Sequence, residues 1–142
     1  MMVQSPRRIA RELALKGLYA FETGQVEVDE IIENIIVDEN LTEKNIKFAQ
    51  SIFRLVNDNR VWADEQIATL ADNWDLERIA IIDLIILRIG LVELEKMPDI
   101  PVKVVLNEAI ELAKTFSTSK SFSFINGILD KFVQIMKENN KL

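Results

Sequence analysis

Three arginines and one tyrosine near the N-terminus have the side-chain types that RNA-binding surfaces use. On a helix, Arg7, Arg8 and Arg11 fall within about 100° of one another, and Tyr19 lies on the same face. A guanidinium group donates a fork of hydrogen bonds to phosphate, and planar groups offer a surface on which an unstacked base can stack. The spacing therefore indicates an RNA-binding face. The same residues also fit a solvated helix end with a half-buried tyrosine at its rim.

This first segment is basic in a chain that is acidic as a whole. Residues 1–20 carry four basic side chains and one acidic side chain, whereas residues 21–43 carry eight acidic side chains and no basic one. The complete chain has 17 basic and 23 acidic residues, which gives a formal net charge of −6. A local basic cluster suits a polyanionic ligand, but solvated helix faces are often basic too. Charge alone leaves both interpretations open.

The composition excludes much of the chemistry that enzymes use. The absence of His and Cys rules out a Ser-His pair, a thiolate nucleophile, a disulfide framework and a zinc-thiolate site. The four glycines lie too far apart to form a phosphate-binding loop. Apolar stretches fall well short of the roughly 20 residues of a membrane span, and the first residues, MMVQSPRR, lack the apolar core expected of a signal peptide. We expect a cytoplasmic protein that is not an enzyme, needs no cofactor or metal and does not enter a membrane.

Helices must position these residues, because every periodic segment repeats at three to four residues. A length of 142 residues, 49% of them hydrophobic, suffices for one packed domain over residues 1–142. Four Gly and three Pro are too few for the turns of a β-sandwich or barrel, so we expect an all-α fold. The predicted helices cover residues 6–22, 27–38, 41–59, 76–96, 102–116 and 122–138. Residues 61–71 either continue the third helix or follow a kink near Asn59.

Three charged residues interrupt the most apolar predicted helix, which covers residues 76–96 and has Asp75 as its expected N-cap. Arg78, Asp83 and Arg88 stand in a segment that is apolar on nearly every face. A charge in such surroundings is costly unless it has a partner. An ion pair within the fold is the commoner explanation for such a residue, and a contact with a partner protein is the functional one.

The dipeptide Asn126-Gly127 stands inside the last predicted helix, where a glycine lowers helix stability. The missing side chain of Gly127 would let a neighbouring helix or a ligand approach the backbone, and close packing is the more common reason. Phe124 lies at the edge of the apolar stripe of this helix, and Asn126 points away from the core.

Several blocks of residues occur in the order and spacing of a known family. They are 7–12 with Leu18-Tyr19, 74–78 with Ile82-Asp83 and 86–88, 99–104, 107–114 and 124–130. In these blocks the chain resembles the NusB family of bacterial transcription antitermination factors, over nearly its whole length. The resemblance implies a compact protein of about seven helices in two subdomains, forming a single NusB-like RNA-binding domain.

The resemblance also implies partners and the residues that meet them. Members of the family bind the boxA element of nascent RNA jointly with ribosomal protein NusE, within the transcription elongation complex. The implied RNA contacts are Arg7, Arg8, Arg11, Lys120, Phe124 and Asn126. Tyr19 and Asp83 match positions at or near the NusE interface. Ser123 stands where relatives often carry a basic residue, and Lys120 is the candidate that supplies this charge from the preceding loop.

Two other functions compete with antitermination. The resemblance extends to ribosomal RNA cytosine methyltransferases, which carry a NusB-like RNA-recognition domain. A helical protein-interaction module without RNA binding is the third possibility, which the net charge of −6 slightly favours. A salt-dependent RNA-binding assay separates this module from the two RNA-binding functions.

Overall fold

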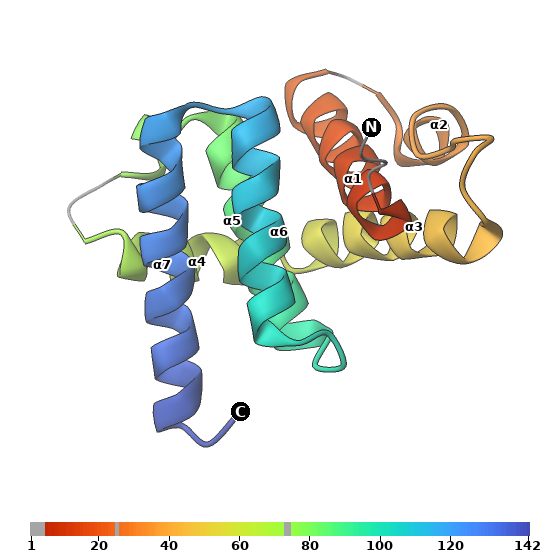
Figure 1. The fold of residues 1–142 in the computed structure, drawn as a ribbon. Coiled ribbons are helices and arrows are strands. Elements are labelled where there is room, and N and C mark those ends of the chain that lie inside the picture. Colours follow the sequence, from red (N-terminus) through yellow and green to blue (C-terminus); the bar gives the residue numbers. More distant parts are fainter. Residues whose placement is uncertain (1–4, 25, 73–74) are drawn as a thin grey trace. The chain divides into compact units, whose positions relative to one another are not determined.

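The computed structural model describes residues 5–24, 26–72 and 75–142. Within these ranges the chain forms α-helices and one 3-10 helix, with no strand, which confirms the all-α prediction. The elements are α1 (Pro6–Thr23), α2 (Val28–Asn34), α3 (Glu43–Asp58), α4 (Arg60–Leu70), the 3-10 helix η1 (Leu76–Arg78), α5 (Ile81–Lys96), α6 (Val102–Phe116) and α7 (Ser119–Glu138) (Figure 1). They divide into two compact units, Met1–Asp58 and Asn59–Leu142.

In the first unit, α1 packs against α3 and α2 (Figure 1). The predicted start of α1 is confirmed, because the Ser5 side chain accepts a hydrogen bond from the Arg8 N–H and Pro6 occupies the first turn. Gly17 permits the approach of α1 to the segment that follows α2, since a Cβ there would lie 2.9 Å from Ile36 Cδ1. This close contact is made by a face of α1 that the arginines do not occupy.

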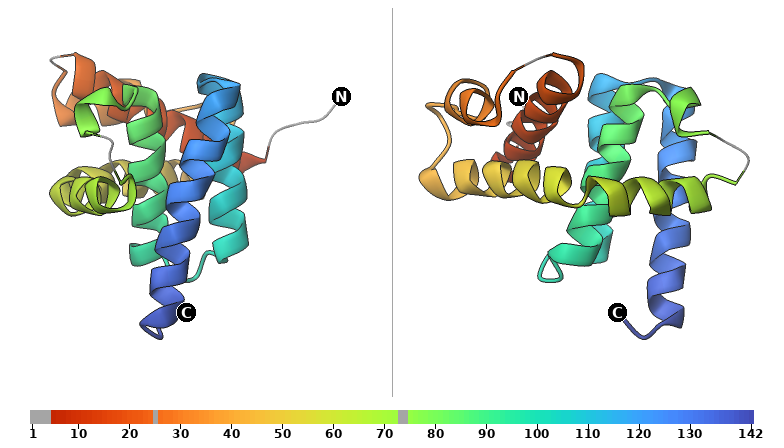
Figure 2. Two further views of the ribbon diagram at one scale, coloured as in Figure 1. Left: turned by 90° about the vertical axis from the view of Figure 1, so that its left-hand side faces the viewer. Right: turned by 180° about the vertical axis from the view of Figure 1, so that it is seen from behind.

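In the second unit, α5 is the central helix. The view from behind in Figure 2 shows α4 crossing α5 and α7, whereas α6 packs on another side of α5. Every residue from Asp83 to Leu94 is buried, as the nearly continuous apolar sequence predicts. Gly90 allows α7 to approach, because a Cβ there would lie 2.9 Å from both methyl carbons of Leu129.

Arg88 is a structural residue of this core. Its Nε and Nη2 donate to the two carboxylate oxygens of Asp64 on α4, at 2.8 and 3.0 Å. A bidentate pair of this kind satisfies the guanidinium at its partly buried site. An ion pair within the fold is thus present for one of the three charged interruptions.

The predicted helix over residues 76–96 is wrong at its start. Leu76–Arg78 form a 3-10 turn, Ile79 and Ala80 are extended, and α5 begins only at Ile81. Ile79 is nevertheless buried, so an extended residue that also points into the core was counted in the helical periodicity. Asp75 occupies the N-cap position of η1, without a capping hydrogen bond from its side chain.

The structure settles one alternative that the sequence left open, and two further boundaries differ from the prediction. Asn59 (φ −112°, ψ 18°) separates α3 from α4, so residues 61–71 belong to a separate helix. The second helix ends earlier than predicted, at Asn34. The last helix begins at Ser119, inside a segment predicted as loop, because the extended Thr118 takes the N-cap position and the Ser121 N–H bonds its carbonyl.

Candidate nucleic-acid interface

Two of the α1 arginines, Arg7 and Arg11, lie over an aromatic ring of α3. The guanidinium carbon of Arg7 lies 3.9 Å from the centre of the Phe48 ring, and that of Arg11 lies 5.1 Å from it. Cations at these distances are attracted to the face of a ring. Phe48 therefore holds two guanidinium groups close together at one place on the first unit. Phe48 was not singled out from the sequence, although an aromatic side chain off the apolar stripe of its helix was the available signal.

The three arginines differ in exposure, although their spacing places them on one face of the helix. Arg7 and Arg8 are partly exposed, whereas Arg11 is only 3% exposed. Helical spacing could not show this difference, because the burial of Arg11 depends on residues of other helices. Tyr19, at 41% exposure, stands open on the same helix.

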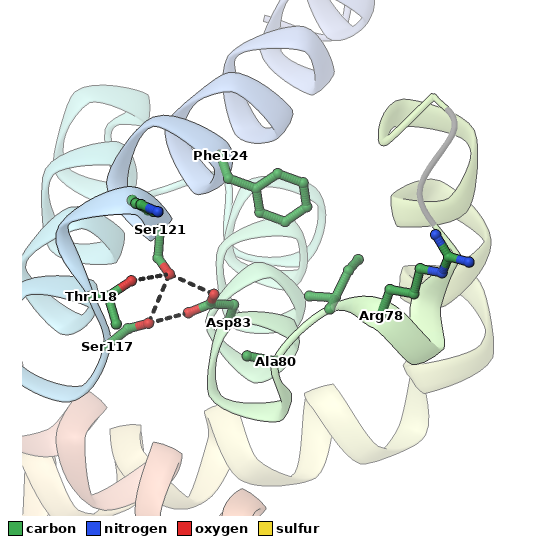
Figure 3. Close-up of a pocket in the computed structure, with 9 residues that line it drawn as sticks. Arg78, Ala80, Asp83, Ser117, Thr118, Ser121 and Phe124 are labelled. Atoms are coloured by element: carbon green, nitrogen blue, oxygen red, sulfur yellow. Dashed lines mark hydrogen bonds between the residues drawn. The ribbon is translucent and has the colours of Figure 1, made fainter.

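A hollow of about 440 Å³ in the second unit contains other candidates. It is bordered by the end of η1, the start of α5 and the α6–α7 junction, with the Phe124 ring directed toward it (Figure 3). Its lining residues are Arg78, Ile79, Ala80, Asp83, Ser117, Thr118, Lys120, Ser121 and Phe124. An aromatic face, two exposed cations and hydroxyl groups in one concavity suit a nucleotide. Asn126 is exposed nearby in sequence but does not line this hollow.

Asp83 forms part of the inner surface of the hollow, where it joins three helices. The Ser117 hydroxyl donates to its Oδ1 at 2.5 Å, and the Ser121 hydroxyl donates to its Oδ2 at 2.6 Å (Figure 3). Asp83 as a whole is only 7% exposed. Asp83 at the start of α5 therefore ties together the end of α6 and the first turn of α7, which carries Lys120 and leads to Phe124. Ser117 and Ser121 were not singled out from the sequence, where they stand in a serine-rich segment.

A second hollow, of about 390 Å³, lies on another side of Phe124. The end of α4 and one face of α7 form it, through Leu70, Ala71, Asp72, Ser123, Phe124, Gly127, Ile128 and Lys131. No heavy atom of the described residues lies within 4 Å of the place where a Cβ of Gly127 would be. Close packing, the commoner explanation for this glycine, is therefore wrong for the described structure, and the space beside it is open.

The comparisons with known proteins agree with this architecture. The model of the NusB family matches residues 8–134, which is most of the chain. The chain belongs to the NusB family. It is 39% identical over 136 residues to transcription antitermination protein NusB of Colwellia psychrerythraea, covering 96% of this chain and 98% of the relative. It is 42% identical to the protein of the same name from Chloroherpeton thalassium, of which it spans 65% of the length and 96% of its own.

Solved NusB structures have the same fold. NusB of T. maritima superposes with a TM-score of 0.84 at 32% identity, with 99% of this chain and 100% of the other covered. A chain from the complex of antitermination factors NusB and NusE with dsRNA superposes with a TM-score of 0.82 at 19% identity, covering 94% and 99%. The predicted architecture of about seven helices in two subdomains is thus confirmed.

Two kinds of feature are absent from the described residues. None of their helices has the length and apolarity to cross a bilayer. They also contain no group of three or more His, Cys, Asp or Glu side chains arranged to hold a metal ion. The relatives compared above are named as antitermination proteins and not as enzymes.

Proposed function

We propose that this NusB-family chain is a cytoplasmic transcription antitermination factor that binds boxA-type single-stranded RNA together with ribosomal protein NusE. It acts within the transcription elongation complex and catalyses no reaction. The names of its relatives support antitermination over the methyltransferase and protein-interaction alternatives. The RNA-binding part of the proposal depends above all on one observation, the stacking of the Arg7 guanidinium on Phe48 at 3.9 Å.

This stacking prepares α1 for a polyanion. A guanidinium that rests with its face on a ring keeps its N–H donors at the edge, where they can meet phosphate oxygens. Because Phe48 already restricts the side chain, less conformational entropy is lost on binding. A chain with a net charge of −6 repels RNA at long range, so binding requires a concentrated local cluster of this kind.

The two units contribute different kinds of contact. Arg7 and Arg8 on α1 and Lys120 on α7 supply phosphate contacts, which carry little sequence information. Arg11, only 3% exposed, instead contacts the Phe48 ring from within the fold. Phe124 supplies a stacking surface for an unpaired base, and stacked bases with exposed edges are how proteins distinguish single-stranded RNA sequences. Lys120, exposed on the first turn of α7, adds charge beside Phe124, and Asn126 offers an exposed amide that can bond a base edge.

Tyr19 contacts NusE directly, whereas Asp83 contributes indirectly, by holding neighbouring segments in place. The exposed Tyr19 ring offers an apolar face and a hydroxyl, the combination that protein interfaces favour. Asp83 is mostly buried and already accepts two hydrogen bonds, so it acts on the partner by holding the α6–α7 junction in place. Asp83→Lys is expected to weaken assembly with NusE more than RNA binding by the isolated chain. Equal losses of both, together with a collapsed melting curve, would contradict that assignment.

The proposed function is tested by titrating boxA-like RNA at several salt concentrations, with and without NusE, against a scrambled RNA of equal length. Three phosphate contacts to a single strand give a log–log salt slope of about −2. NusE should tighten binding of the boxA-like RNA by more than it tightens binding of the scrambled RNA. Weak binding that is equal for both RNAs and insensitive to salt would leave a protein-interaction module as the function.

A further inference from the structure

The ring over which Arg7 lies belongs to a helix that carries exposed cations of its own. Lys44 lies one helical turn before Phe48 on α3, and Lys47 directly precedes the ring. Both lysines are on the side of α3 that points away from its buried residues. All of these residues belong to the first compact unit, in which α1 packs against α3. The cationic surface at the Arg7 stack therefore includes α3 as well as α1.

The two lysines of α3 are available to a ligand. Lys44 is exposed and forms no ion pair with the described residues. The Lys47 ammonium group lies 3.2 Å from a carboxylate oxygen of Glu43, and these side chains are 70% and 83% exposed. An ion pair this exposed contributes little to stability. Phosphate groups can therefore bind both lysines without the loss of a structural contact.

The concentration of cations at this place contrasts with the charge of the segment around it. Residues 1–58 contain seven basic and ten acidic side chains. Two of the seven basic side chains lie over the Phe48 ring, and Lys44 and Lys47 stand within one helical turn of it. Like charges that are placed close together repel one another and lower the free energy of unfolding. A bound polyanion removes this repulsion, so the arrangement favours an anionic ligand.

We propose that Lys44 and Lys47 extend the phosphate-binding surface of α1 onto α3, where they bind the nucleotides that adjoin the boxA-type element on one side. A single strand held by Arg7 passes the Phe48 ring and continues toward the first turn of α3, where the two ammonium groups meet its phosphates. This inference rests on the proposed function. It adds two contacts that depend on RNA length, because an RNA that ends with the boxA-type element does not reach them.

The dependence on length provides the test. Salt titrations compare the boxA-like RNA with two longer RNAs, which carry a short run of uridines at the 5′ end or at the 3′ end. The unextended RNA should keep the slope of about −2, and one of the longer RNAs should reach about −3.4, because each phosphate contact to a single strand adds about 0.7. Lys44→Ala/Lys47→Ala should return this longer RNA to about −2 and leave the unextended RNA unaffected.

Two controls separate local contacts from the general field of the protein. Lys44→Arg/Lys47→Arg retains both charges and should keep the steeper slope. Arg54→Ala removes an exposed cation of α3 on the other side of Phe48 along the helix, and should also keep it. An equal loss of slope for Arg54→Ala and the lysine-to-alanine variant would overturn the inference, because the effect would then come from net charge. All of these positions are exposed, so the variants should melt like the parent.

A further pair of variants tests the carboxylate that competes with the RNA. Glu43→Gln releases Lys47 and should tighten binding of the longer RNA about threefold, the size expected for an exposed ion pair. Glu33→Gln makes the same charge change at an exposed position of α2 and should leave the affinity unchanged. Equal tightening by both variants would contradict a local role of Lys47.

The outcomes distinguish this inference from the function on which it rests. A parent chain whose slope is the same for the unextended and the longer RNAs overturns the inference and leaves the proposed function standing. A Lys44→Ala/Lys47→Ala variant that binds the longer RNA normally but NusE more weakly also overturns it, and assigns the two lysines to the protein partner. A parent chain without salt-dependent RNA binding overturns both the inference and the function.

Discussion

The two candidate surfaces of this chain are built in opposite ways. On α1, charge is concentrated along one helix, and a single ring, Phe48, holds two of the guanidinium groups. At Phe124, shape predominates, because η1, α5, the α6–α7 junction and α7 all contribute to the first hollow. A surface of local charge withstands small shifts of the backbone, whereas a hollow assembled from several segments depends on the bonds that hold them. The difference predicts that binding strength and sequence preference can be lost separately.

The largest effect is expected at Asp83. Asp83→Ala removes the carboxylate that bonds Ser117 and Ser121, and should cost about 3 kcal/mol of stability and lower the Tm by about 10 °C. Asp83→Asn retains one acceptor oxygen and gains a donor, so it should recover about half of the loss. Thermal melting followed by circular dichroism measures both variants. An Asp83→Ala variant that melts like the parent would show that the network does not hold the α6–α7 junction.

Arg11 comes next, because the structure separates it from the other two arginines. Arg11→Ala removes a desolvated guanidinium beside Phe48 and should lower the free energy of unfolding by about 2 kcal/mol. The partly exposed Arg7 provides the matched comparison, since Arg7→Ala should change stability by no more than about 0.5 kcal/mol. Denaturant titration compares the two. Equal stability of both variants would mean that Arg11 is no more a core residue than Arg7.

A smaller effect, confined to sequence preference, is expected at Phe124. Phe124→Ala should weaken binding of boxA-like RNA about tenfold, because one stacked base is worth about 1–3 kcal/mol, and binding of scrambled RNA by less. Phe122 is the matched control on the same helix, since it lines neither hollow. Competition binding with the two RNAs gives the ratio directly. A proportional loss for both RNAs would place Phe124 among the non-specific contacts.

Sequence reasoning found the α1 surface more completely than the hollow, and the reason is physical. Arg7, Arg8 and Tyr19 belong to one helix, whose angular spacing fixes their common face without any tertiary information. Asp83 and its serine partners are separated by 34 and 38 residues, so only the packed helices bring them together. Gly127 shows an intermediate case. Its misfit in a helix was visible in the sequence, but only the structure shows that none of the described residues lies within 4 Å of the place of its missing Cβ.

The central claim is that α1 supplies the electrostatic part of RNA binding while Phe124 supplies the preference. The most direct test is the salt dependence of RNA affinity for Arg7→Ala/Arg8→Ala, with Arg54→Ala on the exposed side of α3 as the control. We predict that the log–log slope falls from about −2 to about −0.7, that affinity for boxA-like and scrambled RNA drops by the same factor, and that the control retains the parent slope. A double variant with the parent slope, or one that loses preference for boxA-like RNA while keeping its affinity for scrambled RNA, would contradict the account.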